Sequence, residues 1–473
     1  MTTIARIASI AFAVGALSAP YAQAQPTLIA VGTMDSSRAG SFSDLSGLKY
    51  NLENGVKATE LGGLGSALAY ADGNVFLALP DRGPNAVTFD LAIDNTASYI
   101  NRFHTITMDL QPNTSGTGLP YTLTPTLQAT TLLWSLTPLV YGNGEGLGVG
   151  SGVPPVNNFL QHFFTGRSDN FDSSHNSGDA NDARFDSEGL RMSNDGLSVF
   201  ISDEYGPYIY QFNRLTGVRI RSFQLPASFY VTNLSPVGAT EIGGNTSGRT
   251  ANKGMEGLAI TPDGKTLVGI MQDPLIQDSK AGATKLLRIV TIDIASGQVT
   301  HQYAYGLTSG TGVSEICALN QTEFLVDERD GTGREANNTD PGTVALKKQL
   351  FKINLSGAVD VSNMDGPTAE MHTVGKTLFL DVVAALTAGG ISPELIPSKI
   401  EGVAFGPDIK KNGAILHTLW LANDNDFLET TEDPSGNVIP NPNQFFVFGV
   451  SDADLGGSPF VPQQISPLAL FGL

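Results

Sequence analysis

A short unit recurs five times along the chain, and this repeat limits the possible folds more than any other feature of the sequence. Each copy has a leading polar residue, a short apolar run, a turn, a second apolar run and an acidic end. The leading residue is Glu188, Glu256, Glu315 or Glu401 in four copies and Ser66 in the fifth. A repeated unit of this kind cannot bury its apolar face alone, so the copies must stack against one another.

The spacing of the copies predicts an all-β protein of the β-propeller class. Successive leading glutamates lie 68, 59 and 86 residues apart, and such intervals fit a four-stranded antiparallel blade with decorated loops. The interval of 122 residues from Ser66 to Glu188 is long enough for one more blade or for a long insertion. We therefore predict about six blades, with five or seven also compatible, in a single domain of residues 25–473.

Local patterns agree with this fold class. Apolar runs such as residues 75–79 and 286–292 are bounded by turn residues, as is typical of strands. Residues 142–185 are rich in Gly, Asn, Asp and Ser and predict a long loop insertion. A strand near residues 28–32 is expected to complete the final blade and close the ring. The main helix that the sequence favours covers residues 377–386.

The first 24 residues have the pattern of a signal peptide and are left out of the fold argument. Arg6 precedes an apolar run at residues 7–17, which is too short to span a bilayer. Ala22 and Ala24 supply the small residues that signal peptidase accepts, so we predict cleavage after Ala24; an uncleaved anchor is the alternative. No later apolar run has the length of a membrane span, and the expected location is the periplasm or the extracellular space.

The chain is strongly acidic, with a formal charge of −19 that becomes −20 when Arg6 is removed with the signal peptide. Such a surface repels the phosphates of nucleic acids and attracts cations. The single cysteine, Cys317, excludes an intrachain disulfide. The six histidines show no metal-ligand spacing, which argues against zinc, whereas oxygen ligands outside the cell favour Ca²⁺.

The acidic residues of the repeat are expected to gather on one face of the propeller. In an antiparallel sheet, the start of one strand and the end of its neighbour meet at the same edge. The leading and terminal carboxylates of each repeat should therefore lie together near the central axis. The predicted metal ligands are Asp81, Glu188, Asp203, Glu204, Glu256, Glu315, Asp327, Glu401 and Asp424. For each of them, an ordinary turn carboxylate is the alternative interpretation.

Several basic residues stand beside these acidic motifs. A guanidinium group binds phosphate oxygens in pairs, and cations near a phosphoryl group neutralise its developing charge. The predicted substrate-binding residues are Arg82, Arg184, Lys253, Arg329 and Lys399. The alternative is that each pairs with a neighbouring carboxylate and holds the edge of its blade.

The predicted catalytic residues are Glu256 and Glu328, of which one would activate water, together with Arg82 and Arg329. Ser66 is the competing nucleophile, but its flanks do not match Gly-x-Ser-x-Gly and no histidine accompanies any of the motifs.

Taken together, the motifs resemble the phytase-like family described as "esterase-like activity of phytase". The matching segments are residues 63–68, 79–83, 186–190, 202–207, 252–258, 314–316, 326–329 and 400–403. They span residues 60–427, which is nearly all of the mature chain. The resemblance implies an exported propeller that hydrolyses phosphoesters or related esters, with Ca²⁺ as its metal.

The leading hypothesis is an exported, calcium-dependent phosphoester hydrolase that acts as a monomer on a small molecule and binds no nucleic acid. A lactonase or carboxylesterase of the propeller type is the second hypothesis. A non-catalytic propeller that binds a ligand or a cell-surface partner is the third.

Overall fold

The computed structural model describes residues 25–35, 43–84, 96–142, 152–335, 342–411 and 413–467. The predicted signal peptide at residues 1–24 lies outside these residues. Among them, no helix is long and apolar enough to cross a membrane.

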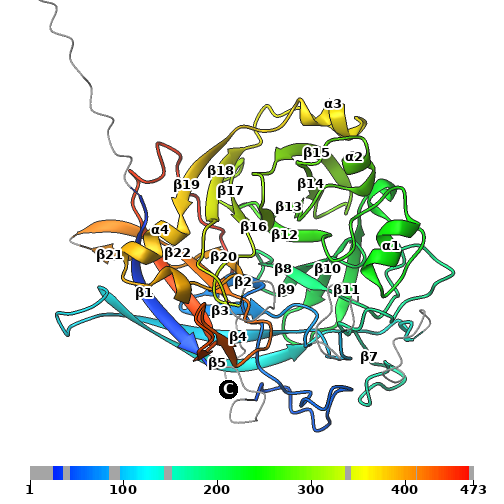
Figure 1. Cartoon of the computed structure of the whole chain (residues 1–473), viewed down its shortest axis with the longest axis horizontal. Coiled ribbons are helices and arrows are strands. Elements are labelled where there is room, and N and C mark those ends of the chain that lie inside the picture. The colour runs from blue at the N-terminus through cyan, green and yellow to red at the C-terminus, as the bar shows by residue number, and fades with distance from the viewer. Residues whose placement is uncertain are drawn as a thin grey trace, which may run out of the picture.

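Five four-stranded antiparallel sheets, the blades, surround a common axis (Figure 1). Blade 1 contains β2 (Ala67–Asp72), β3 (Val75–Leu79), β4 (Arg102–Pro112) and β5 (Tyr121–Leu132). Blade 2 contains β8 (Ser187–Met192), β9 (Ser198–Asp203), β10 (Tyr208–Asn213) and β11 (Arg219–Gln224). Blade 3 contains β12 (Met255–Ile260), β13 (Thr266–Met271), β14 (Leu286–Asp293) and β15 (Val299–Gly306).

Blade 4 contains β16 (Gly312–Ala318), β17 (Glu323–Arg329), β18 (Lys348–Asn354) and β19 (Lys376–Asp381). Blade 5 is built from both ends of the chain: β20 (Ile400–Phe405), β22 (Ala414–Asn423), β25 (Asn443–Val450) and β1 (Thr27–Met34). Short strands decorate the blades, namely β6 (Trp134–Ser135), β7 (His162–Phe163), β21 (Ile409–Lys411), β23 (Thr430–Glu432) and β24 (Val438–Pro440).

The propeller prediction is confirmed, with five blades in place of the central expectation of six. The described residues of the long interval after Ser66 form no additional blade. They include the extended β4–β5 hairpin and, before β8, the β6–β7 pair and isolated bridges such as that between Thr165 and Arg184.

The N-terminal strand closes the ring, as the sequence predicts. β1 pairs antiparallel with β25, from Thr27 opposite Gly449 to Met34 opposite Asn443. Blade 5 therefore joins residues that lie more than four hundred positions apart, and the two ends of the fold hold each other in place.

The helices are short and lie in the connections between strands: α1 (Gly238–Gly244), α2 (Ile276–Lys280), α3 (Gly366–Glu370) and α4 (Val382–Ala388), with the 3₁₀ turns η1 (Ala227–Phe229) and η3 (Pro393–Leu395). The helix expected at residues 377–386 is correct only in its second half. Its first half is β19, which pairs with β18 as the outer strand of blade 4. Asp381 ends the strand and begins α4, because its side chain accepts a hydrogen bond from Ala384 N.

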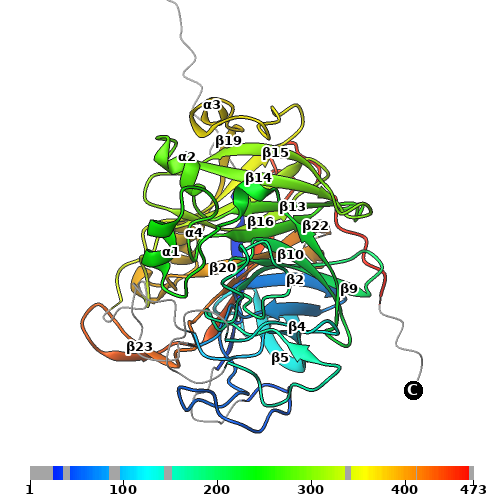
Figure 2. The ribbon, with the colours of Figure 1, turned by 90° about the vertical axis from the view of Figure 1, so that its right-hand side faces the viewer.

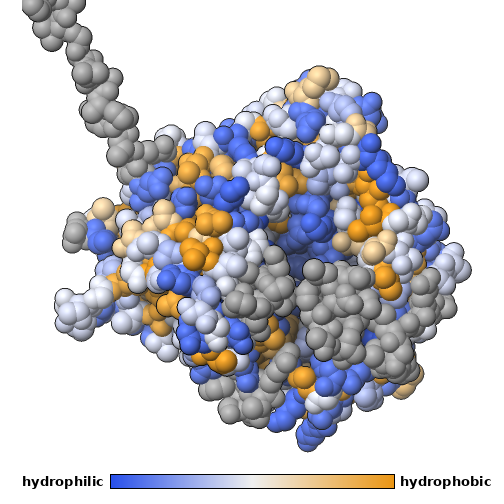
Figure 3. Space-filling view, in the orientation of Figure 1, coloured by the Kyte–Doolittle hydropathy of each residue, from blue (hydrophilic) through white to orange (hydrophobic). Residues whose placement is uncertain are grey.

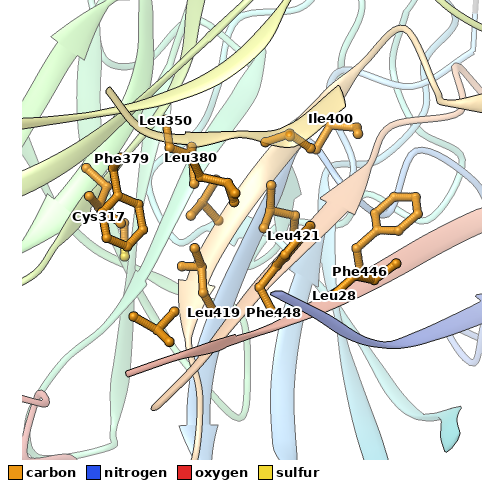
Figure 4. Packing of buried hydrophobic residues seen from close by; sticks show 14 of the residues in the cluster. Leu28, Cys317, Leu350, Phe379, Leu380, Ile400, Leu419, Leu421, Phe446 and Phe448 are labelled. Carbon is orange, nitrogen blue, oxygen red and sulfur yellow. The ribbon is translucent and has the colours of Figure 1, made fainter. Parts of the chain in front are cut away.

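Apolar side chains fill the space between neighbouring blades. Figure 4 shows one such layer, in which Leu350 and Phe379 of blade 4 face Leu421 and Phe446 of blade 5. Cys317 lies buried in the same layer as a free thiol. The innermost strands have few exposed residues on either side, since they pack against the blades before and after them.

The glycine that follows the leading glutamate in three repeats allows the innermost strands to approach one another. A Cβ atom at Gly189 would lie 2.6 Å from Leu258 Cβ, and one at Gly257 would lie 2.8 Å from Ile316 N. Gly402 is packed in the same way against the backbone of blade 1, and its N–H donates to Gly65 O at 2.7 Å. The Glu-Gly pair of the repeat is therefore a requirement of the central packing as well as a source of carboxylates.

Arg191 of β8 connects the innermost strands at the axis. Its guanidinium donates to carbonyl oxygens of three other blades: Leu68 (3.1 Å), Ile316 (2.8 Å) and Val403 (3.2 Å). Arg191 Nη2 also lies 3.0 Å from Glu315 Oε2, and Glu315 Oε1 accepts from Leu258 N of blade 3 at 2.9 Å. This ion pair and its hydrogen bonds thus reach all five blades.

A C-terminal segment, residues 455–466, crosses the far side of the ring and is called the strap below. Val461 N donates to Leu319 O of blade 4 at 3.0 Å, and Ser466 N donates to Asn194 O of blade 2 at 2.8 Å. The Phe460 ring packs against the Phe405 ring, with centroids 4.4 Å apart and the ring planes 36° apart. Figure 2 shows this red segment on the opposite side of the disk from α1 and α2.

We predict that Arg191→Met lowers the free energy of unfolding by about 3–5 kcal/mol. The substitution leaves Glu315 buried without its cation, and carbonyl oxygens of three blades lose the hydrogen bonds that they accept from Arg191. Urea denaturation at a pH of about 8, where Glu315 is ionised, followed by fluorescence measures the effect. Arg214→Met is the matched control: Arg214 lies in a surface turn and donates to Gly196 O at 3.4 Å, so a change within about 0.5 kcal/mol is expected. Equal midpoints for the two variants would contradict the role given to Arg191.

Candidate functional site

A polar cleft with a volume of about 550 Å³ opens on the face where the innermost strands begin. Figure 3 shows hydrophilic surface gathered in the hollow near the middle of this face. Ten of the predicted site residues line the cleft: Asp81, Arg82, Glu188, Glu204, Lys253, Glu256, Arg329, Lys399, Glu401 and Asp424. They come from all five blades, as the shared-edge argument requires.

Irregular backbone at the start of the innermost strands aims the leading glutamates into the cleft. The strand register shifts between Met255 and Gly257 and between Ile400 and Gly402, so Glu256 and Glu401 stand outside the ladder. Glu188 lies within a similar shift between Ser187 and Leu190 of β8. β-bulges commonly redirect a side chain in this way beside a functional site.

The basic residues of the cleft are held by acidic or amide partners. Arg82 Nη1 donates to Asp186 Oδ2 at 2.6 Å and also contacts Asn252. Arg329 pairs with Glu401, and its Nε donates to Ser314 Oγ at 2.8 Å. Lys253 Nζ lies 2.7 Å from Asp273 Oδ2 nearer the solvent.

Among the residues that the structure describes, two groups of carboxylates have the geometry to hold a cation. In the first cluster, defined as Asp186, Glu188 and Glu204, one oxygen from each residue lies within 4.8 Å of the others. The second cluster, Asp81, Asp424 and Asp426, meets the same limit. Both clusters contribute to the cleft lining, and burial raises the pKa of Asp81, with further contributions from the charges of Asp424 and Asp186.

Burial dominates the electrostatics of these carboxylates. It raises the pKa of Glu204 to about 7, and the charge of Asp186 adds to this effect. Burial likewise raises the pKa of Glu188, with further contributions from Glu256 and Asp186, and that of Glu256, with a further contribution from Glu204. Such shifts occur where carboxylates are crowded away from water, and a bound cation would reverse them.

Backbone strain is concentrated around the same cleft. Among the described residues, the non-glycine positions with positive φ are Asn252 (55°), Glu335 (66°), Asp426 (51°) and Phe427 (57°). Asn252 lines the cleft, Asp426 belongs to the second cluster, and Phe427 follows it directly. Strained backbone of this kind persists only where the surroundings hold it, and it is common at functional sites.

Five predicted site residues lie outside the cleft lining. Glu315 is bound to Arg191 at the axis, and its neighbour across the ladder, Asp327, is buried with neither carboxylate oxygen hydrogen bonded. Asp203 Oδ1 accepts from Asp186 N (3.0 Å) and Tyr205 N (2.9 Å), so it holds the turn after β9.

Arg184 and Glu328 are not part of the cleft lining, although Glu328 accepts from Thr311 Oγ1 of that lining at 3.0 Å. The Arg184 guanidinium lies 4.5 Å from the centre of the Phe171 ring and 3.8 Å from Glu241. Glu328 accepts from Thr308 N at 3.1 Å and pairs with Lys376. Burial acts to raise its pKa, but these donors outweigh it and lower the pKa. The roles expected for Arg184 in substrate binding and for Glu328 in catalysis stay predictions, and both residues have partners outside the cleft lining.

The cleft also contains polar residues beyond the predicted set. Asn252, Gln272, Asp273, Thr311, Ser314 and Asp330 are part of its lining. Most of them are adjacent in sequence to a residue of the repeat motifs, and this position could have indicated that they line the cleft. The sequence also indicates Asp186 of the first cluster and Asp426 of the second as possible metal ligands, since each lies two residues from a predicted ligand.

Comparison with known proteins identifies the family of this chain. A family model described as phytase-like, "esterase-like activity of phytase", matches residues 59–427. A protein of Arthroderma benhamiae named as an uncharacterized secreted protein is 33% identical over 187 residues, which cover 33% of this chain and 36% of that protein. The alignment thus spans about a third of the relative's length.

Two solved structures show only a distant likeness to this chain. A gluconolactonase from Xanthomonas campestris is 9% identical with a TM-score of 0.29, and the match covers 90% of this chain and 98% of that one. The glutaminyl cyclase of Myxococcus xanthus is also 9% identical, with a TM-score of 0.32 and coverage of 90% and 100%. Neither likeness is strong enough to bear on activity.

We predict that the metal-free protein loses stability as the pH rises from about 5 to about 8. Burial raises the folded-state pKa of Glu315 and of Asp203 to about 7, so both keep protons that the unfolded chain has already released. Since the folded state binds more protons in this window, the free energy of unfolding must fall with increasing pH. Urea denaturation in EDTA across the range measures the slope; a flat or rising profile would show that these carboxyls are not buried as described.

Proposed function

Because this chain belongs to the phytase-like family, we propose that it is an exported, calcium-dependent hydrolase of small phosphoesters whose active site is the cleft at the mouth of the propeller. The family is described by its esterase-like activity, which supports hydrolysis of an ester bond. The choice of a phosphoester rests on one observation. The cleft sets the guanidinium groups of Arg82 and Arg329 and the ammonium groups of Lys253 and Lys399 among buried carboxylates.

The donor set of the first cluster fits a hard divalent cation. All its ligands are carboxylate oxygens, which Ca²⁺ prefers. Asp186 is fully buried, and its Oδ1 has no hydrogen-bond partner, as is also true of Oε2 of the adjacent Glu256. Buried carboxylate oxygens without partners are costly unless a cation or another donor satisfies them. Asp186, Glu188 and Glu204 would hold the ion, which when bound neutralises phosphoryl oxygens and lowers the pKa of water.

The other residues of the cleft have distinct roles in this proposal. Arg82 and Arg329 bind phosphate oxygens, each kept in position by a carboxylate partner, Asp186 and Glu401 respectively. Glu256, which lies beside the first cluster and lines the cleft, accepts a proton from the attacking water once a cation has lowered its pKa. Lys253, more exposed than the others, contacts the substrate near the rim.

The lining favours a polar substrate over an ester with a long acyl chain. Val313 is the only residue with an aliphatic side chain among the described residues of the lining. A carboxylesterase of lipids would need an apolar groove to bury its substrate. A lactone, which is small and polar, remains the second candidate substrate.

Ser66 is a poor nucleophile in this structure. It is buried, and its hydroxyl lies 3.5 Å from Gly63 O, at the limit of a hydrogen bond. No histidine belongs to the described cleft lining, so no base of the kind that activates a serine is present there.

Export is part of the proposal and is supported by the signal-peptide pattern of the first 24 residues and by the name of the Arthroderma relative. The acidic surface supports a small-molecule substrate and argues against nucleic acid. Action as a monomer is proposed on the grounds that a single chain contributes all five blades and the whole described cleft.

We predict that Glu256→Gln lowers kcat/KM for a phosphomonoester by roughly 10²–10⁴-fold, because the amide cannot accept the proton. Arg329→Lys and Arg82→Lys should also lower it, since lysine keeps the charge but loses the paired donors. The assay compares phosphomonoesters, phosphodiesters, phytate, short esters and lactones, with Ca²⁺ or EDTA.

Ser66→Ala is the matched control, because Ser66 holds the leading position of the repeat in blade 1 and should be dispensable for turnover. Full activity of Glu256→Gln together with an inactive Ser66→Ala would replace the metal-phosphoester mechanism by a serine esterase. Turnover of lactones alone would favour the second candidate.

Calcium should raise the melting temperature of the wild-type protein and EDTA should lower it. A ligand that binds only the folded state adds about 2.7 kcal/mol at a hundredfold excess over its Kd. Asp186→Asn should remove most of this shift, whereas Asp263→Asn, in the β12–β13 turn, should preserve it. Scanning calorimetry measures the melting temperature of all three proteins with Ca²⁺ or EDTA. If the melting temperature of the wild-type protein did not change with calcium, a bound ion in the cleft would be excluded.

A further inference from the structure

One wall of the cleft is formed by a continuous piece of the chain. Residues 310–314 all belong to the lining, and they are the longest uninterrupted run among its described residues. They comprise the end of the connection between β15 and β16, residues 307–311, and the first three residues of β16. We infer that Glu328 is a positioning residue that holds this connection, called the wall loop below, where it contacts the substrate. The inference rests on the proposed function, because the wall loop belongs to the same cleft.

One carboxylate oxygen of Glu328 binds two residues of the wall loop. Glu328 is fully buried, and its Oε2 accepts from Thr308 N at 3.1 Å and from Thr311 Oγ1 at 3.0 Å. The Thr311 hydroxyl also lies 2.7 Å from Thr308 O, so its single proton can serve either acceptor. Thr311 N donates to Thr308 O at 3.3 Å, which closes the turn. The carboxylate therefore fixes the loop at both sides of its tip.

The other carboxylate oxygen of Glu328 is held by neighbouring strands. Oε1 accepts from Tyr305 OH of β15 and pairs with Lys376 of β19. Lys376 Nζ in turn donates to Thr308 Oγ1 at 2.9 Å and lies 4.4 Å from the centre of the Phe351 ring. Strands of blades 3 and 4 thus hold the carboxylate in place, and a charged acceptor makes stronger hydrogen bonds to the loop than a neutral one would.

The next residue of β17 holds the other end of the same wall. Arg329 Nε donates to Ser314 Oγ at 2.8 Å, and Ser314 stands in the register shift between Val313 and Glu315. Adjacent residues of a strand face opposite sides, so Arg329 belongs to the cleft lining while Glu328 contacts the wall loop from outside it. Two successive residues of one strand therefore fix the two ends of the wall.

The tip of the wall loop depends on this anchor. Ser309 and Gly310 are exposed, and Gly310 has a φ of 80°, which glycine adopts without strain. Lys347 adds one donor at the surface, from its Nζ to Ser309 O at 2.9 Å. An exposed tip has little packing of its own, so its position is set by the buried bonds at its base. The loop contacts a part of the substrate that does not react, and its loss of order should therefore raise KM and leave kcat nearly unchanged.

Steady-state kinetics with a phosphomonoester test this role. Glu328→Ala should raise KM by roughly tenfold or more and change kcat by less than about threefold. Thr311→Val keeps the shape of the side chain but removes the hydroxyl, so it should also raise KM, and Thr311→Ser should raise it less. The effects of Glu328→Ala and Thr311→Val should not add in the double variant, because both remove the same hydrogen bond. Glu323→Ala is the matched control: this carboxylate lies at the far end of β17 with Asn320 and Ser458 as partners, and both constants should stay unchanged.

Amide hydrogen exchange follows the wall loop without any turnover. The amides of residues 308–311 should exchange faster in Glu328→Ala than in the wild type and at the wild-type rate in Glu323→Ala. Unaltered exchange in a folded Glu328→Ala would overturn the inference. A large loss of kcat with KM unchanged would also overturn it and make Glu328 a catalytic residue. If Glu328→Ala does not fold, Thr311→Val serves for both measurements. A wild type that hydrolyses no phosphoester would refute the proposed function, and the exchange rates would still decide whether Glu328 holds the loop.

Discussion

The ion pair between Arg191 and Glu315 is the interaction on which the rest of the molecule depends. It lies where five innermost strands converge, and it supplies donors and acceptors to backbone groups that water cannot reach. The ion pair also separates two different regions along the axis. On one side, at the start of the innermost strands, lie the carboxylates of the cleft. On the other side, at the end of these strands, a small cavity of about 80 Å³ lies beneath the strap.

The cleft is built by the same features that pack the ring. A bulge removes Glu256 and Glu401 from the ladder, and the glycine after each lets the next blade approach. β16 departs from this plan, since Ile316 replaces the glycine and the register shift comes one residue earlier. Its glutamate, Glu315, remains in the ladder and binds Arg191 instead of lining the cleft. The leading glutamate of this one repeat is therefore part of the central ion pair and not of the cleft lining.

Much of this could be predicted from the sequence, because the repeat carries both its strand pattern and its carboxylates. The fold class, the pairing of residues 28–32 and ten of the fifteen predicted site residues in one cleft follow from that pattern. Asp327 and Glu328 are adjacent on one strand and face opposite sides, yet neither belongs to the cleft lining, so the strand period alone does not place them. The number of blades and the position of the Arg184 side chain over Phe171 depend on tertiary packing, and the spacing of the repeats along the sequence does not determine either of them.

The closure of blade 5 by β1 sets the order of events when the chain folds. β1 is synthesised first, yet its partner strand β25 is nearly the last to be made. Until then β1, which becomes the outer strand of blade 5, has no ladder partner. Contacts of such long sequence separation form slowly. Residues 27–34 therefore spend the whole of synthesis as an unpaired apolar strand, the state in which this protein is most vulnerable to association with the wrong partner.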